Sequence, residues 1–231
     1  MPFIMATATK TDPVEKARKR SLKKFLYYFP KGYSDQKYID WERQYKSDAH
    51  MQFKESLNRA TFAAMLGEGK FKEIAFEAVR IESRTNLLFS FEKMALRDAL
   101  KFPHGARAFA TGLFDYIYGA DDLPDRFERF AEVVGKLPRK QTRVLTWPLV
   151  TVFGFIGNPQ EHIFLKPRVT QLAAEKYKFD FYYTSKPNWE TYQSLIEFAA
   201  QVRKDTKAYR PKDYIDLQSF IWVLGSEEYD D

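Results

Sequence analysis

Two turns in the last third of the chain place cations directly ahead of a predicted helix. One is Lys166-Pro167-Arg168, and the other is Ser185-Lys186-Pro187-Asn188-Trp189. The amide groups and the dipole at a helix N-terminus favour an anion, so cations at the same point can complete a site for phosphate or carboxylate. The alternative is a pair of ordinary surface turns, each with a polar residue that caps the helix.

Trp189 gives the second turn an aromatic side chain beside Lys186. An indole next to a cation can stack on a nucleobase, which contributes about 1–3 kcal/mol per base. A tryptophan in the first turn of a helix is also typical of a hydrophobic core. If Lys166, Arg168, Lys186 and Trp189 lie at the same end of one β element, they form a single basic edge lined by an aromatic ring.

Two carboxylates are candidate acids or bases. Glu82 lies in the polar segment 80–86, and Asp216 lies in a hydrophobic helix near the C-terminus. A carboxyl group in apolar surroundings has a raised pKa and can transfer protons. The alternative is structural, with Glu82 paired to an arginine, Asp213 capping the last helix and Asp216 paired to a neighbour such as Lys212.

Other chemistries are excluded or unsupported by the residue types present. The chain has no cysteine, which rules out disulfides, thiolate ligands and a cysteine nucleophile. Its three histidines, His50, His104 and His162, lack the close spacing that puts two metal ligands on one helix face. The sequence therefore predicts no metal site and no cofactor, and it leaves catalytic residues unassigned.

The positive charge of the chain is concentrated at its N-terminus. The net charge is +6, and residues 1–30 contain seven Lys or Arg but only two acidic residues. The remaining residues hold 30 basic and 29 acidic side chains and are nearly neutral. Cations gathered in this way favour contact with phosphates. The candidate contacts of this segment are Arg18, Lys19, Arg20, Lys23 and Lys24.

The hydrophobic pattern predicts a mainly α protein, a single multi-helix domain with a small β element in its C-terminal third. Residues 1–30 form a basic N-terminal arm, and residues 31–231 form one helical globular domain. Strands are predicted at 162–166 and 179–184, and 142–156 is ambiguous, because its β-branched and aromatic residues favour a strand whereas Pro148 argues against a central one. The predicted helices are 12–29, 35–57 (one helix or a bent pair), 61–66, 71–81, 87–99, 106–118, a helix that follows the acidic turn 121–124 and ends at 134, 169–177, 189–202 and 214–224.

The location of the protein follows from three features. The longest apolar stretch, 144–156, is shorter than the roughly 20 residues of a membrane-spanning helix. The N-terminus lacks the basic and apolar regions of a secretory signal. Together with the absence of cysteine, these features predict a cytoplasmic protein without a transmembrane segment.

Four segments of the sequence stand out: IESRTNLLFSFEK from Ile81, HIFLKP from His162, PNWETY from Pro187 and DLQSFIWV from Asp216. They resemble an uncharacterised family of bacterial proteins, and the resemblance covers most of the chain after the arm. It implies a bacterial origin and one domain of conserved length, and it assigns no activity.

The leading functional hypothesis is a non-enzymatic protein that binds DNA or RNA, with the arm and the two basic turns in contact with phosphates. A second hypothesis is an adaptor that binds an acidic protein surface or an anionic membrane. A third is an enzyme that holds a small anion at Lys166, Arg168 and Lys186 and uses Glu82 or Asp216 as its base. Oligomeric state is left open.

Overall fold

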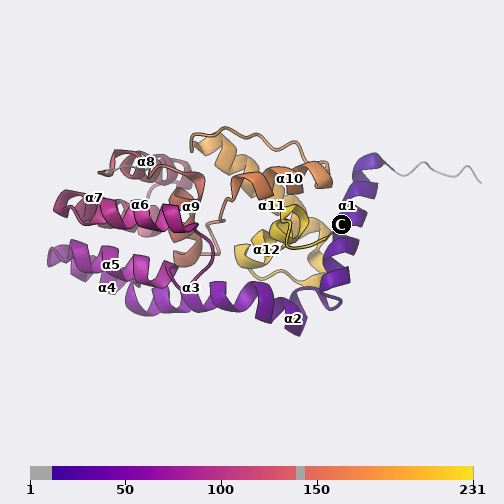
Figure 1. Cartoon of the computed structure of the whole chain (residues 1–231), viewed down its shortest axis with the longest axis horizontal. Coiled ribbons are helices and arrows are strands. Elements are labelled where there is room, and N and C mark those ends of the chain that lie inside the picture. Colours follow the sequence, from indigo (N-terminus) through magenta and orange to yellow (C-terminus); the bar gives the residue numbers. More distant parts are fainter. Residues whose placement is uncertain (1–11, 139–143, 231) are drawn as a thin grey trace, which may run out of the picture.

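The computed structural model describes residues 12–138 and 144–230, and every regular element in this part of the chain is a helix (Figure 1). Helices α2, η2 and α3 form one continuous helix, and its segment η2 is a π-helix. The elements are α1 (Pro13–Tyr28), η1 (Gly32–Ser34), α2 (Gln36–Tyr38), η2 (Ile39–Arg43), α3 (Gln44–Ser56), α4 (Arg59–Gly67), α5 (Phe71–Glu82), α6 (Ser90–Leu100), α7 (Pro103–Tyr118), α8 (Leu123–Lys136), α9 (Trp147–Gly157), α10 (Pro167–Tyr177), α11 (Trp189–Asp205), η3 (Lys207–Tyr209) and α12 (Tyr214–Gly225).

The helices gather toward the two ends of an elongated molecule. Helices α4 to α8 form one end, whereas α1, α10, α11 and α12 form the other (Figure 1). Helix α9 is buried along almost its whole length, and α12 is nearly as enclosed. Helices that are apolar on all sides belong in a core. One continuous set of buried side chains joins both ends.

Helix α1 is held by a cap and by two aromatic anchors. The Asp12 side chain accepts a hydrogen bond from the backbone N–H of Val14, and Pro13 occupies the first turn. Phe25 and Phe29 are fully buried, and α1 packs against α10 and α12. The helix predicted at 12–29 is therefore confirmed, and its aromatic end belongs to the core.

The prediction of a small β element is wrong. In the part of the chain that the structure describes, segments 162–166 and 179–184 are extended but do not pair with each other. Their backbone N–H groups donate to hydroxyls on α9 and α11 instead: Ile163 to Tyr192, Leu165 to Thr151, Tyr182 to Ser194 and Thr184 to Thr191, at 3.0–3.1 Å. Side-chain hydroxyls thus satisfy donors that a partner strand would otherwise satisfy.

The ambiguous stretch 142–156 is mostly helical. Its residues from Trp147 onward belong to α9, while 142 and 143 lie outside the described residues. Thr146 caps the helix, and Pro148 lies in the first turn, where its missing N–H leaves no helical hydrogen bond unmade. The proline that argued against a central strand therefore fits the start of this helix.

Candidate anion-binding groove

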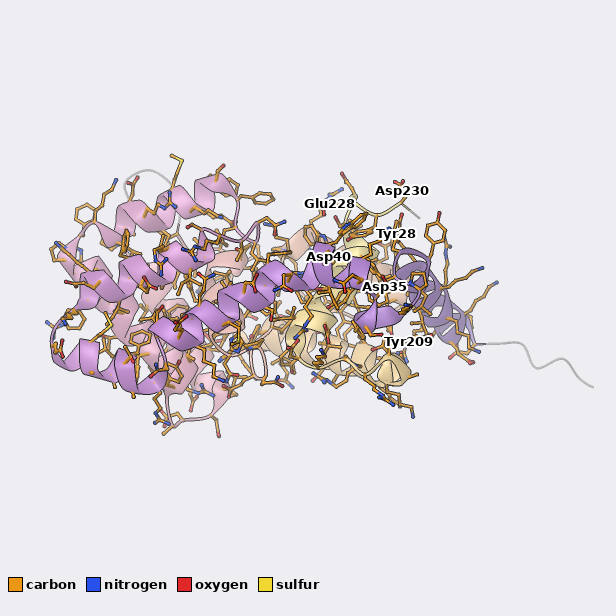
Figure 2. The ribbon with its side chains drawn as sticks, turned by 90° about the horizontal axis from the view of Figure 1, so that it is seen from below. Tyr28, Asp35, Asp40, Tyr209, Glu228 and Asp230 are labelled. Carbon is orange, nitrogen blue, oxygen red and sulfur yellow. The ribbon has the colours of Figure 1, made fainter. Side chains whose placement is uncertain are left out.

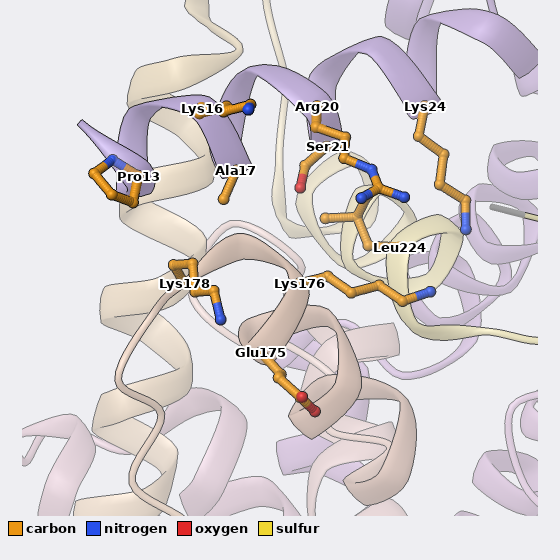
Figure 3. A pocket seen from close by; sticks show the side chains of 10 residues that line it. All are labelled: Pro13, Lys16, Ala17, Arg20, Ser21, Lys24, Glu175, Lys176, Lys178 and Leu224. Carbon is orange, nitrogen blue, oxygen red and sulfur yellow. The ribbon is translucent and has the colours of Figure 1, made fainter. Parts of the chain in front are cut away.

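A groove of about 440 Å³ separates α1 from the C-terminal end of α10 (Figure 3). We call it the basic groove. Its walls carry five cationic side chains and one carboxylate. The lining residues are Pro13, Lys16, Ala17, Arg20, Ser21, Lys24, Glu175, Lys176, Lys178 and Leu224.

Helical periodicity puts three of the cations on one wall. Lys16, Arg20 and Lys24 are spaced four residues apart, so they form one stripe along α1 that is about 12 Å long. Figure 3 shows Arg20 and Lys24 extending from the same side of α1, with Lys24 directed to the C-terminal segment. Small residues below them, Ala17 and the buried Ser21, leave room for the groove.

The opposite wall is the end of α10. Lys176 lies in its last turn, where the negative end of the helix dipole favours a cation. Lys178 follows as the C-cap in the left-handed conformation, with φ of 56°, and its backbone N–H donates to the carbonyl of Glu175. This cap turns the chain so that Lys178 also reaches the groove.

The charges that line the groove are mostly positive. Among the described residues that line it, Glu175 is the one acidic residue, and the Nζ of Lys24 donates to the backbone carbonyl of Tyr229 at 2.9 Å. Five cations around one carboxylate create a positive local potential, which attracts anions.

Acidic side chains also lie at this end of the molecule. Seen from below, Asp35, Asp40, Glu228 and Asp230 gather near Tyr28, at the C-terminal end of α1 (Figure 2). The groove runs along that helix from Pro13 to Lys24, and at Lys24 it adjoins Tyr229, which stands between Glu228 and Asp230.

The cations predicted in the arm take different positions. Arg20 and Lys24 line the groove. Arg18 turns to the helix body, with its guanidinium 5.6 Å from the ring centroid of Tyr177 and its Nε 3.8 Å from Asp205. The two others, Lys19 and Lys23, are exposed on α1 outside the groove lining, and Lys19 pairs with Glu15 at 2.6 Å.

Lys166 is enclosed rather than presented at the surface. Its residue is 9% exposed, and its Nζ donates to the carbonyl of Leu87 at 2.9 Å. The same ammonium lies 3.5 Å from the ring centroid of Phe89. Burial lowers the pKa of Lys166 despite the nearby carboxylates of Glu92 and Glu82. These contacts fix the loop between α5 and α6.

Glu82 belongs to the same buried cluster. Its carboxylate lies 3.4 Å from the Nζ of Lys93, and burial raises the pKa of Glu82. The hydroxyl of Thr85 donates to the backbone carbonyl of Glu82. The predicted pairing of Glu82 is thus observed with a lysine in place of an arginine.

The remaining predicted cations and Trp189 are surrounded by different elements. Arg168 is exposed beside Glu227 and Glu228 of the C-terminal tail. Lys186 is exposed, whereas Trp189 is half-buried against Phe127 of α8. The two basic turns therefore do not form one aromatic-lined edge.

The acidic residues of α12 form a structural network. Asp213 caps the helix as predicted, accepting from the backbone N–H of Ile215. Asp216 is fully buried and bonds to the guanidinium of Arg43 at 2.6 Å and to the hydroxyl of Tyr38 at 2.6 Å. Lys212 reaches Asp216 through its backbone N–H. The carboxylate is therefore fully partnered inside the protein.

Sequence reasoning missed three residues of the groove as binding residues, namely Lys16, Lys176 and Lys178. The four-residue spacing of Lys16 from Arg20 is the one signal that could have found the first. The other two come from a helix about 150 residues later, and only the packing of α10 on α1 brings them in.

No helix within the described ranges has the length and apolar character needed to cross a membrane. Among the same residues, no group of three or more histidine or acidic side chains is arranged to hold a metal ion. Comparison with protein-family models, curated proteins and solved structures found no match for this chain.

Proposed function

We propose that this protein binds the phosphate backbone of a nucleic acid in the basic groove. The observation that carries the proposal is the set of five cations around one carboxylate between α1 and α10. Outside the first 30 residues the chain is close to neutral. Electrostatic affinity for phosphates is therefore expected at this groove more than elsewhere.

The dimensions of the stripe suit a nucleic-acid strand. Lys16, Arg20 and Lys24 span about 12 Å along α1. One strand of a duplex rises about 3.4 Å per phosphate, so the stripe covers roughly three to four phosphates. Lys176 and Lys178 would approach the same backbone from the other wall.

The lining supports binding without base recognition. Sequence is read by hydrogen bonds to base edges, and single-stranded bases are held by stacking on aromatic rings. None of the described residues that line the groove is aromatic or carries an amide side chain. We therefore expect similar affinity for different sequences and a steep dependence on salt.

The test is fluorescence anisotropy with labelled 20-base-pair DNA, the matching single strand and an RNA duplex over a salt series. The full chain should bind, and the logarithm of its association constant should fall linearly with the logarithm of the salt concentration. Lys16→Gln and Arg20→Gln should each reduce the salt slope by about 1. The matched control is Lys19→Gln, on the same helix but outside the lining, and it should leave the slope unchanged.

Charge-neutralising substitutions are preferable to removal of the arm. Phe25 and Phe29 are buried in the core, so deleting residues 1–30 would disrupt folding along with binding. Absence of binding at low salt would refute the proposal. An equal reduction of the salt slope in Lys19→Gln and Arg20→Gln would refute the assignment of binding to this groove.

A further inference from the structure

A second groove, of about 600 Å³, lies between α5 and α6 at the end of the molecule away from α1. We call it the α5–α6 groove. Its floor is apolar, and its rims carry cations from both helices. The lining residues are Lys72, Ala75, Phe76, Val79, Arg80, Ser83, Arg97, Leu100 and Lys101.

The packing of the two helices explains why the groove stays open. Both α5 and α6 pack against α7, and their contact with α7 is more extensive than their contact with each other. Helix α5 buries Ile74 and Ala78 against the body of the protein. Phe76 therefore points outward and is 69% exposed, although it lines the groove. An exposed large apolar side chain in an apolar groove marks an interaction surface.

The charged residues that line the groove are cations. Among the described residues that line it, none is acidic. Arg80 pairs with Glu77 and Lys101 pairs with Asp98, each at 2.6 Å, whereas no ion-pair partner of Lys72 or Arg97 is found in the described part of the chain. A partner that covers the apolar floor would gain from negative charge on both of its flanks.

We infer that the α5–α6 groove binds an acidic amphipathic helix of another protein. The part of the groove along α5, from Lys72 to Ser83, is about 16 Å long, which matches three turns of helix. An amphipathic helix presents apolar residues to such a groove and charges on each side of them. Cations on both rims favour this occupant over an amphiphile with one anionic head, and the concave floor favours it over a flat membrane.

The test uses a defined probe, a capped 18-residue peptide with leucines at i, i+3, i+4 and i+7 spacing and glutamates on both flanks. Its control is the same peptide with glutamines in place of the glutamates. By calorimetric titration, the glutamate peptide should bind about tenfold more tightly to the full chain. Arg97→Gln and Lys72→Gln should each weaken the glutamate peptide about two- to fivefold and leave the glutamine peptide unaffected.

Two further variants separate this site from nonspecific attraction. Phe76→Ser should weaken both peptides, because it removes apolar contact, whereas Lys23→Gln on α1 should affect neither. The inference is overturned if the glutamate peptide does not bind, or if Lys23→Gln weakens it as much as Arg97→Gln does. Phe76-dependent binding to vesicles of phosphatidylserine and phosphatidylcholine, without binding of the peptide, would also overturn it and indicate a lipid surface instead.

Discussion

The most enclosed charges of this protein hold helices together. Arg43 leaves η2 and bonds to both oxygens of Asp213 and to Asp216, which joins the long helix α2–α3 to α12. Breaking such a pair by removing one partner leaves an uncompensated buried charge, which costs far more than the pair itself contributes.

Replacing this arginine should therefore destabilise the fold strongly. Arg43→Met leaves Asp216 buried without its cation, and we expect the free energy of unfolding in urea to fall by about 3–5 kcal/mol. The matched control is Arg129→Met. Arg129 pairs with Asp115 at 2.8 Å on the surface, so its loss should cost less than about 1 kcal/mol. Equal losses in the two variants would contradict this assignment.

His162 is the buried group that should make stability depend on pH. It is fully buried, its Nε2 lies 3.4 Å from Glu161, and burial lowers its pKa. The contact with His162, together with Arg126, lowers the pKa of Glu161 to about 2. The unfolded chain therefore protonates this histidine at a higher pH than the folded protein does.

Below about pH 6.5 the unfolded state binds more protons at His162, so stability should fall as the pH falls. The loss can reach about 1.4 kcal/mol per pH unit for this one group. Glu161 adds its own loss only below its ordinary pKa of 4.5. Unfolding titrations between pH 7.5 and 5 should show a smaller pH dependence for His162→Gln, and wild-type behaviour for the exposed His104→Gln. An unchanged pH dependence in His162→Gln would refute the role.

At the scale of the elements, sequence predicted the helices well and the extended segments poorly. The spacing of apolar residues at 12–29 and 106–118 carries enough information to identify α1 and α7. The segments 162–166 and 179–184 have the residues of strands, and they are extended. Local sequence does not reveal that their N–H partners are hydroxyls on α9 and α11.

The hydroxyl of Thr151 should be essential to this arrangement. It is fully buried on α9 and accepts from the backbone N–H of Leu165 at 3.1 Å. Thr151→Val leaves that donor unpaired, and we expect a loss of about 1–3 kcal/mol in urea unfolding. Thr151→Ser should retain most of the stability, and Thr111→Val on the exposed face of α7 should change it by less than about 0.5 kcal/mol. A similar loss of stability in Thr151→Ser would indicate that the packing of Thr151, and not its hydrogen bond, stabilises this arrangement.

The candidate site could be predicted only in part for a related reason. Arg20 and Lys24 stand out as part of a basic run, and helical spacing relates them to Lys16. Whether a cation on α1 faces solvent, the core or another helix depends on tertiary packing. That packing turns Arg18 toward Tyr177 and brings Lys178 of a distant segment to the groove.

At the scale of the whole molecule, the two grooves lie at opposite ends. The basic groove lies at the end formed by α1 and α10, where acidic side chains such as Glu228 and Asp230 also lie (Figure 2). The α5–α6 groove lies at the opposite end. The proposed nucleic acid and the proposed protein partner would therefore occupy separate surfaces.

The central claim is that the position of the cations, and not the net charge of the protein, provides affinity for nucleic acid. Two double variants with equal changes in net charge test it: Lys16→Glu with Arg20→Glu in the groove, and Lys54→Glu with Arg59→Glu on exposed sites of α3 and α4. We predict that the groove variant loses duplex DNA binding at about 0.1 M salt by at least tenfold more than the control variant. Equal losses in the two variants would contradict the account.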